Sequence, residues 1–324
     1  MSRVTVALLS ATDDMAPMAQ AWKALYPTHD LRCGDDLGNV EEIDAAVCWF
    51  PPPGVLAHLP RLRLVQSVGA GIEHLCMDPQ LPRHLPTFRI VDPQMAAGMA
   101  AYVAWAVISA QRHIDHYAGA QRAHQWASAQ VQAPHSHGVG VLGLGELGLH
   151  CARSLAALGY RVAGWSRSAK ADLPAGVRGF SGAGQLPEFL SGCDSLVCLL
   201  PLTAETTGLL DRSLFARLPW GAHLVNVGRG DHLIEADLLA ALESGQLGLA
   251  TVDTFRVEPL PASHPFWPHP RIRVTPHIAT RTPVQTIAAQ LLENLASLAP
   301  GLSDSAGLGH EAASARRVQW ARGY

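Results

Sequence analysis

The stretch VGVLGLGELGLHCARSLAALGY, residues 139–160, decides the fold class of this chain. It places Gly143, Gly145 and Gly148 between an apolar, strand-like run and an amphipathic helical segment, and a second strand-like run follows at once. In a dinucleotide-binding unit the first glycine permits a tight turn, the second lets the backbone approach a pyrophosphate, and the third lets helix and strand pack closely. The helix N-terminus adds unpaired amides for the phosphates. The pattern predicts a Rossmann-type unit; an ordinary strand-to-helix turn is the alternative.

The second strand-like run leads into RVAGWSRSAK, residues 161–170, where such a unit normally carries an acidic residue. Here the segment offers Ser166, Arg167, Ser168 and Lys170, and the first acid is Asp172. A carboxylate would hydrogen-bond the adenosine ribose and repel a 2′-phosphate, whereas an arginine can hold that phosphate through two parallel bonds. We therefore predict that NADP(H) is preferred, with NAD(H) possible. The alternative is that Arg167 is an unengaged surface cation.

Short β-type runs alternate with helical segments along the whole chain, which predicts an α/β protein with parallel sheets and helical crossovers. A length of 324 residues favours two domains. The β-type runs are VTVALLS, AAVCWF, LRLVQS and FRIVD before residue 93, and VGVLG, RVAGW, SLVCLL, HLVNV, LATVD and IRVTP after it. Two helical segments end at glycines in C-cap positions, Gly159 and Gly245.

Composition excludes several classes of function. A net charge of −3, with no basic block, argues against nucleic-acid binding. The run at residues 95–110 is too short to span a bilayer and predicts a buried helix, and the N-terminus shows no secretory signal. Six scattered cysteines predict reduced thiols in a cytoplasmic protein, with no disulfide and no metal site. His113 and His116 are expected on an exposed helical face.

Three further fragments resemble the D-isomer-specific 2-hydroxyacid dehydrogenase family. They are HLVNVGRGDHLIEADLLAALESG from residue 223, VDTFRVEPLPASHPFWPHPRIRVTPHIA from residue 252, and LLPLTAETTGLL at residues 199–210. The segments WSRS, WPHP and the terminal RGY most resemble the glyoxylate/hydroxypyruvate reductase branch. This resemblance implies two Rossmann-like domains. A discontinuous, flavodoxin-like substrate domain would use residues 1–98 and 285–324, and an NAD(P)-binding domain residues 99–284.

The resemblance makes Arg229, Glu258 and His277 the catalytic residues, and their chemistry suits the reduction of a small 2-oxo acid. A guanidinium can fork onto the carboxylate and carbonyl oxygens and polarise the C=O bond. His277 would be the general acid, and a carboxylate at Glu258 would favour its protonated form and hold its orientation. Taken singly, each residue has a structural alternative: a core histidine, a helix-capping or surface arginine, and a loop carboxylate.

The remaining site predictions fall into two groups. Residues expected to bind the cofactor are Gly143, Gly145, Glu146, Leu147, Gly148, Ser166, Arg167, Ser168, Leu200, Pro201, Thr206, Val227, Gly228 and Asp253. Residues expected to bind the substrate are Val68, Gly69, Ala70, Gly71, Trp49, Trp267 and Arg281. The glycine loop in RLVQSVGAGIEHL would offer main-chain amides to the substrate carboxylate, although a plain strand-to-helix turn is the alternative. The two tryptophans, with Phe50 as a further candidate, would wall a small pocket.

The chain departs from the family pattern in two places. The long helix expected at residues 92–109 has Ala100 and Ala101 near Tyr102, where many members carry an acid. The stretch GLSDSAGLGHEAASA, residues 301–315, is rich in small residues and is expected to be flexible or superficial.

The resulting hypothesis is an NADPH-dependent reductase of glyoxylate or hydroxypyruvate, homodimeric by family analogy. Two alternatives stay open. A binding protein or co-repressor of the same fold that senses NAD(P) would keep the same three residues. A dehydrogenase for a larger 2-hydroxy acid would share the mechanism.

Overall fold

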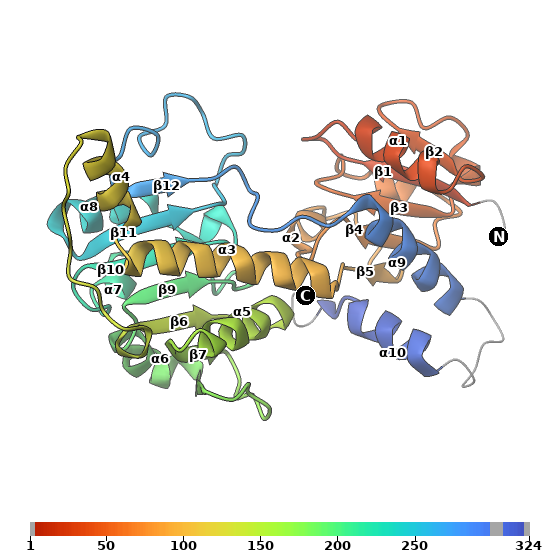
Figure 1. Cartoon of the computed structure of the whole chain (residues 1–324). Helices are drawn as coiled ribbons and strands as arrows, with labels where there is room; N and C mark the ends of the chain where they lie inside the picture. The colour runs from red at the N-terminus through yellow and green to blue at the C-terminus, as the bar shows by residue number, and fades with distance from the viewer. Residues whose placement is uncertain (1–3, 299–306, 321–324) are drawn as a thin grey trace. The chain divides into compact units, whose positions relative to one another are not determined.

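The structure, a computed structural model, describes residues 4–298 and 307–320, which belong to two compact units (Figure 1). Unit 1 comprises Met1–Asp92 and Arg281–Tyr324, and unit 2 comprises Pro93–Thr280. The chain passes between the units a few residues before each boundary expected from the sequence. At the first passage the reason is local, because helix α3 begins at Pro93 and packs along its length against a helix of unit 2.

Unit 1 contains a sheet with the strand order β2-β1-β3-β4-β5, in which every pairing is parallel. This order is the flavodoxin-like one, so the expected topology of this unit is confirmed. Its strands are β1 Thr5–Leu9, β2 Asp30–Cys33, β3 Ala45–Cys48, β4 Leu64–Ser67 and β5 Thr87–Phe88. Its α-helices are α1 Ala16–Leu25, α2 Glu73–Cys76, α9 Val284–Ser297 and α10 Gly307–Arg316, and two 3-10 turns lie at Val40–Glu42 and Val55–His58.

Unit 2 contains a parallel sheet with the order β12-β11-β10-β9-β6-β7-β8. Counted from β6, this is the Rossmann order with one added strand, and the order reverses between β6 and β9, where such sheets bind their ligands. Its strands are β6 Gly138–Leu142, β7 Arg161–Ser166, β8 Val177–Ser181, β9 Ser195–Cys198, β10 Ala222–Asn226, β11 Leu247–Val252 and β12 Ile272–Val274. The predicted α/β fold class is confirmed.

Helices cover both faces of the unit 2 sheet. Helices α3 and α5 lie together on one face (Figure 1), whereas α6, α7 and α8 pack on the other. The α-helices are α3 Pro93–Gln111, α4 Ile114–Arg122, α5 Glu146–Ala157, α6 Gly182–Ser191, α7 Arg212–Phe215 and α8 Glu235–Ser244, and 3-10 turns lie at Pro134–Ser136 and Gly230–His232. Gly159 and Gly245 follow α5 and α8 with positive φ, as their C-cap positions predicted.

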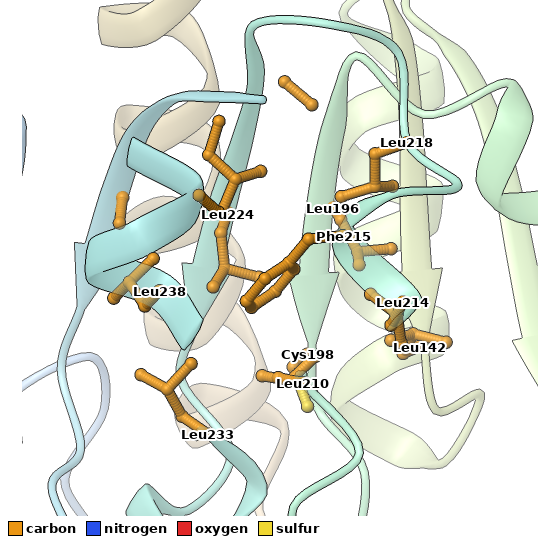
Figure 2. Packing of buried hydrophobic residues seen from close by; sticks show 14 of the residues in the cluster. Leu142, Leu196, Cys198, Leu210, Leu214, Phe215, Leu218, Leu224, Leu233 and Leu238 are labelled. Carbon is orange, nitrogen blue, oxygen red and sulfur yellow. The ribbon is translucent and has the colours of Figure 1, made fainter. Parts of the chain in front are cut away.

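Successive side chains of each strand point to opposite faces of the sheet and so pack into two separate hydrophobic clusters. Leu196 and Leu224 face the cluster on the α7 side, while the adjacent Val197 and Val225 face the cluster under α3 and α5. Figure 2 shows Phe215 of α7 reaching toward the leucines of the sheet at the centre of the first cluster. Both faces are dry, so the strands read as continuous apolar runs in the sequence.

Two strands, β2 and β8, were missed by the sequence analysis, and both are edge strands. Every residue of β2 is half-buried, and Phe180 is the one buried residue of β8. A strand that is covered incompletely lacks the apolar run by which the central strands were recognised.

The small-residue stretch at 301–315 was expected to be flexible or superficial. Its described part, from residue 307, forms helix α10, in which Ala312, Ser314 and Ala315 are exposed. The helix is fixed at its end by Arg316, which is buried and donates to Asn294 (3.0 Å) and to Glu293 (2.8 Å) on α9. The terminal RGY and residues 301–306 lie outside the described residues. Across the described ranges, none of the helices combines the length and apolar character needed to cross a membrane.

Candidate functional site

The predicted cofactor residues all lie at one edge of the unit 2 sheet. They lie at the carboxyl ends of β6, β7, β9, β10 and β11 or in the segments that follow these ends, and the carboxyl ends of parallel strands meet at the same edge. Arg229 follows β10, Glu258 follows β11 and His277 follows β12. One edge of one sheet therefore carries both the phosphate-binding loop and the predicted acid–base residues.

The glycine loop has the geometry that a pyrophosphate requires. Gly143 has φ +101°, and a Cβ there would lie 2.7 Å from the Leu199 carbonyl oxygen of the next strand. A Cβ at Gly148 would lie 1.8 Å from the Gly143 oxygen, so the close approach of helix and loop depends on this glycine. A Cβ at Gly145 would meet no described atom within 4 Å, which leaves open space beside the first, unpaired amides of α5. These three environments match the three glycine roles, and the site fits a dinucleotide.

The loop after β7 presents two exposed cations, Arg167 and Lys170, and the hydroxyl of Ser168 for a further anion. Ser166 is buried and its hydroxyl donates to the Ser168 carbonyl (2.8 Å), so its hydrogen serves the loop itself. Arg167 and Ser168 are exposed. The hydrogen bond from Thr203 lowers the pKa of the Glu205 carboxyl, to which its own amide and the charge of Arg167 also contribute. The loops after β7 and β9 are thus close enough for Arg167 to act on Glu205.

The backbone around Arg229 is clamped by two side chains that the sequence analysis did not single out. The Arg229 N–H donates to Nδ1 of His232 (3.0 Å), and its carbonyl accepts from the amide of Asn226 (3.1 Å). His232 is fully buried, and its Nε2 lies 3.3 Å from the Pro201 carbonyl. The guanidinium itself donates to the Gly228 carbonyl (2.7 Å). In the sequence, the position of His232 three residues after Arg229 was the signal that could have indicated this contact.

The side chains of Glu258 and His277 are directly hydrogen-bonded. Nδ1 of His277 lies 2.8 Å from Oε2 of Glu258, and the other carboxylate oxygen accepts the Phe255 N–H (2.8 Å). Burial opposes ionisation of Glu258, but the hydrogen bond and charge of His277, the Phe255 amide and the charge of Arg229 together hold its pKa below the ordinary value. The carboxylate is therefore ionised at neutral pH, and all three predicted catalytic residues interact within unit 2.

The backbone of His277 adopts a conformation that side chains rarely take. Its φ is +52°, and its N–H donates to the carbonyls of Asp253 (2.9 Å) and Thr275 (3.0 Å). Left-handed backbone at a residue other than glycine persists only where the surroundings enforce it, and such residues cluster at functional sites. The strain supports a functional role for His277.

The predicted substrate loop of unit 1 follows β4. The Val68 N–H donates to the Cys48 carbonyl (3.2 Å) and the Gly69 N–H to the hydroxyl of Ser67 (3.1 Å). Within the described parts of the chain, the N–H groups of Ala70 and Gly71 have no partner. If this loop binds a carboxylate through its backbone, these two amides are the donors available.

The other predicted substrate residues are dispersed. In unit 1, Trp49 packs edge-on against Phe50 (ring centroids 5.1 Å apart), and the exposed Arg281 opens the C-terminal part of the unit. In unit 2, Trp267 is 49% exposed, and its indole N–H donates to the Pro261 carbonyl (2.9 Å). His113 and His116 are exposed, as expected. In the ranges that the structure describes, no three His, Cys, Asp or Glu residues are grouped as metal ligands would be.

Comparison with known families agrees with this geometry. The family model described as "D-isomer specific 2-hydroxyacid dehydrogenase, NAD binding domain" matches residues 104–279, which is more than half of the chain. A glyoxylate/hydroxypyruvate reductase A from Serratia proteamaculans is 41% identical over 269 residues, covering 82% of this chain and 85% of that protein. The family and the branch that the sequence resembles are therefore confirmed.

Solved structures are similar over the full length. A D-isomer-specific 2-hydroxyacid dehydrogenase from Xanthobacter autotrophicus, in complex with NADPH and MES, is 38% identical with a TM-score of 0.87, covering 100% of both chains. An NADPH-dependent glyoxylate/hydroxypyruvate reductase from Sinorhizobium meliloti, in complex with NADP and sulfate, is 32% identical with the same TM-score and coverage.

Proposed function

Because the chain belongs to the D-isomer-specific 2-hydroxyacid dehydrogenase family of NAD(P)-dependent oxidoreductases, we propose that it reduces glyoxylate or hydroxypyruvate with NADPH. The observation that carries this proposal is the His277–Glu258 pair, 2.8 Å apart, on the sheet edge that also bears the glycine loop and Arg229. The names of the relatives support the substrate, and the bound cofactors of the solved structures support NADPH.

The residues divide the chemistry between them. Bound NADPH supplies the hydride. Arg229 holds the carboxylate of the 2-oxo acid and polarises its carbonyl, because a guanidinium can form two parallel bonds to such oxygens. His277 gives a proton to the carbonyl oxygen as negative charge develops there, a contribution of roughly 10²–10⁴-fold. Glu258 stabilises the imidazolium and, by accepting from Nδ1, makes Nε2 the nitrogen that delivers the proton.

The cofactor is held by the glycine loop, the start of α5 and the loops after β7, β9, β10 and β11. Arg167 and the hydroxyl of Ser168 bind the 2′-phosphate, because the Ser166 hydroxyl is already engaged. Asp253 lies at the end of β11 among these residues. In this assignment unit 2 is the NAD(P)-binding domain and unit 1 the substrate domain. Ala70 and Gly71 offer their amides to the substrate carboxylate, while Trp49, Trp267 and Arg281 shape selectivity.

The decisive experiment follows the oxidation of NADPH and NADH with a panel of 2-oxo acids. We expect turnover with glyoxylate and hydroxypyruvate and higher kcat/KM with NADPH than with NADH. Tight NADPH binding without turnover of any acid would replace the enzyme by a sensor or co-repressor of the same fold. Clear preference for a longer or phosphorylated 2-oxo acid would reassign the substrate and leave the mechanism intact.

The assembly proposed is a homodimer formed through the α3–α4 region of unit 2. Trp105 and Ile108 on α3, Ile114 on α4 and the following Trp126 are large apolar side chains that are exposed in the single chain. We assign the association surface to these helices, because large exposed apolar side chains mark such a surface where they form one patch. Light scattering after size exclusion would give twice the chain mass, and Ile108→Glu would give the monomer.

The free cysteines support a cytoplasmic location.

A further inference from the structure

The carboxylate of Asp253 is committed to the loop that carries His277. Oδ1 accepts the Ile278 N–H (2.9 Å) and Oδ2 accepts the Ala279 N–H (2.9 Å), while the Asp253 carbonyl accepts the N–H of His277 itself. Asp253 is only 1% exposed, so these bonds replace water around a buried acid. Three consecutive amides, beginning at the strained His277, are therefore fixed by one residue at the end of β11.

The same carboxylate is bonded through a hydroxyl to helix α3. The Thr275 hydroxyl lies 2.6 Å from Oδ1 of Asp253 and is also hydrogen-bonded to the hydroxyl of Tyr102. A carboxylate can only accept, so the single hydrogen of Thr275 points at Asp253. The Tyr102 hydroxyl must then be the donor to Thr275. The direction of the chain is fixed: Tyr102 donates to Thr275, and Thr275 donates to Asp253.

Tyr102 is suited to a permanent donor role. Burial raises the pKa of Tyr102 to about 12, against the effect of its bond to Thr275, so the phenol keeps its proton at any working pH. Its ring also packs against Trp105 one turn later on α3, with centroids 5.2 Å apart. The phenol therefore has a fixed position from which to order Thr275.

From this chain of bonds we infer that Tyr102, acting through Thr275 and Asp253, is a positioning residue that holds the imidazole of His277 against Glu258. The inference rests on the proposed function, in which that imidazole delivers the proton. Left-handed backbone at His277 is unfavourable by itself and needs external support. The hydroxyl of Tyr102 contributes to that support from α3, a helix for which the sequence analysis predicted no catalytic residue.

The test compares Tyr102→Phe with Tyr160→Phe. Tyr160 is a matched control, because its buried hydroxyl also donates to a residue of α3, Gln111 (3.5 Å), away from the histidine loop. Thr275→Val removes the linking hydroxyl, and Thr275→Ser restores it. For each protein, kcat and KM for glyoxylate are measured across pH, NADPH binding is measured separately, and the ring of His277 is titrated by NMR.

Loss of the Tyr102 hydroxyl should lower kcat about five- to tenfold, as expected for one hydrogen bond that positions a catalytic group. Thr275→Val should cost more than Tyr102→Phe, and Thr275→Ser should recover most of the wild-type rate. NADPH affinity should stay within about twofold in all of them. A looser His277–Glu258 pair stabilises the imidazolium less, so the alkaline limb of the rate profile and the NMR titration of His277 should both move to lower pH.

Two results would overturn the inference. One is an unchanged alkaline limb and His277 titration in Tyr102→Phe, indistinguishable from Tyr160→Phe. The other is a loss in Thr275→Val that Thr275→Ser fails to restore. Failure of the proposed function looks different: the wild type would then turn over no 2-oxo acid, and the NMR titration would still decide whether Tyr102 positions His277.

Discussion

Two histidines of the unit 2 sheet, one near each end of its strands, show how the surroundings decide what an imidazole does. His277, after β12, is partly exposed and paired with Glu258. His223, near the start of β10, is fully buried and shares one hydrogen bond with the hydroxyl of Thr251 (2.9 Å). Burial, with the nearby charges of Arg273 and His137, lowers the pKa of His223 to about 3. One ring lies beside a carboxylate, and the other has its pKa lowered by burial.

The two ends of the sheet differ in their partners. At the amino end, His137 bonds to the hydroxyl of Ser195 (2.9 Å), and burial lowers its pKa as well. A hydroxyl can hydrogen-bond either form of the imidazole, but it carries no negative charge that would favour the imidazolium against burial. At the carboxyl end, the partner is a carboxylate that is itself kept ionised. The two ends therefore differ in the groups that face the imidazole: hydroxyls face His137 and His223 in the core, whereas a carboxylate faces His277 at the edge where the strands end.

The largest expected effect is on turnover, and it follows from removing the imidazole at the carboxyl end of the sheet. His277→Ala should lower kcat by at least about 100-fold, because the proton donor is lost, while NADPH binding is retained. The matched control is His264→Ala, since His264, in the loop between β11 and β12, also pairs with a glutamate, Glu235 at the start of α8 (3.2 Å). We expect that control to keep nearly full turnover in a steady-state assay. An unchanged rate for His277→Ala would remove this residue from the mechanism.

The next effect concerns stability at the amino end. Because the folded pKa of His223 lies far below that of an unfolded histidine, its stabilising contribution is complete above about pH 6.5 and is lost as pH falls toward 3. Between pH 7 and pH 5 this amounts to about 2 kcal/mol of the free energy of unfolding. Urea unfolding at both pH values should show a correspondingly smaller loss for His223→Gln, which can keep the bond to Thr251.

His116→Gln is the control for that measurement, because it removes a histidine from the exposed face of α4. It should leave the pH dependence as in the wild type. Equal acid sensitivity of His223→Gln and the wild type would mean that His223 is not the group protonated on unfolding.

The smallest effect concerns the carboxyl edge of the sheet, to which we assign both anionic groups of NADPH, the pyrophosphate and the 2′-phosphate. Arg167→Ala should raise KM for NADPH about tenfold and change KM for NADH little, because only NADPH carries the 2′-phosphate. Lys170→Ala, which removes an exposed cation from the same loop, serves as the control. Equal losses with both cofactors, or an effect of Lys170 as large as that of Arg167, would contradict the assignment.

Much of this molecule could be predicted from contiguous stretches of sequence. The central strands are buried on both faces and read as apolar runs, and the glycine loop has a fixed local spacing because a turn, a phosphate and a helix start follow each other within a few residues. The edge strands β2 and β8 were not predicted, because strands that are only partly buried lack a continuous apolar run. Helix α10 was not predicted either, because it is held by the hydrogen bonds of Arg316 to α9, which a local pattern does not reveal.

The predicted catalytic residues were recognised separately, in different segments of the sequence. They interact because the fold places the ends of β10, β11 and β12 side by side. The parallel sheets, the dinucleotide loop and the residue types available for hydride reduction could be predicted from the sequence, because each depends on spacing along the chain. The hydrogen bonds that join Tyr102, Thr275 and Asp253 to the loop of His277, and the lowered pKa of His223, are visible only in the folded chain. Those facts depend on which atoms from distant segments meet out of water, where hydrogen bonds and charges are strongest.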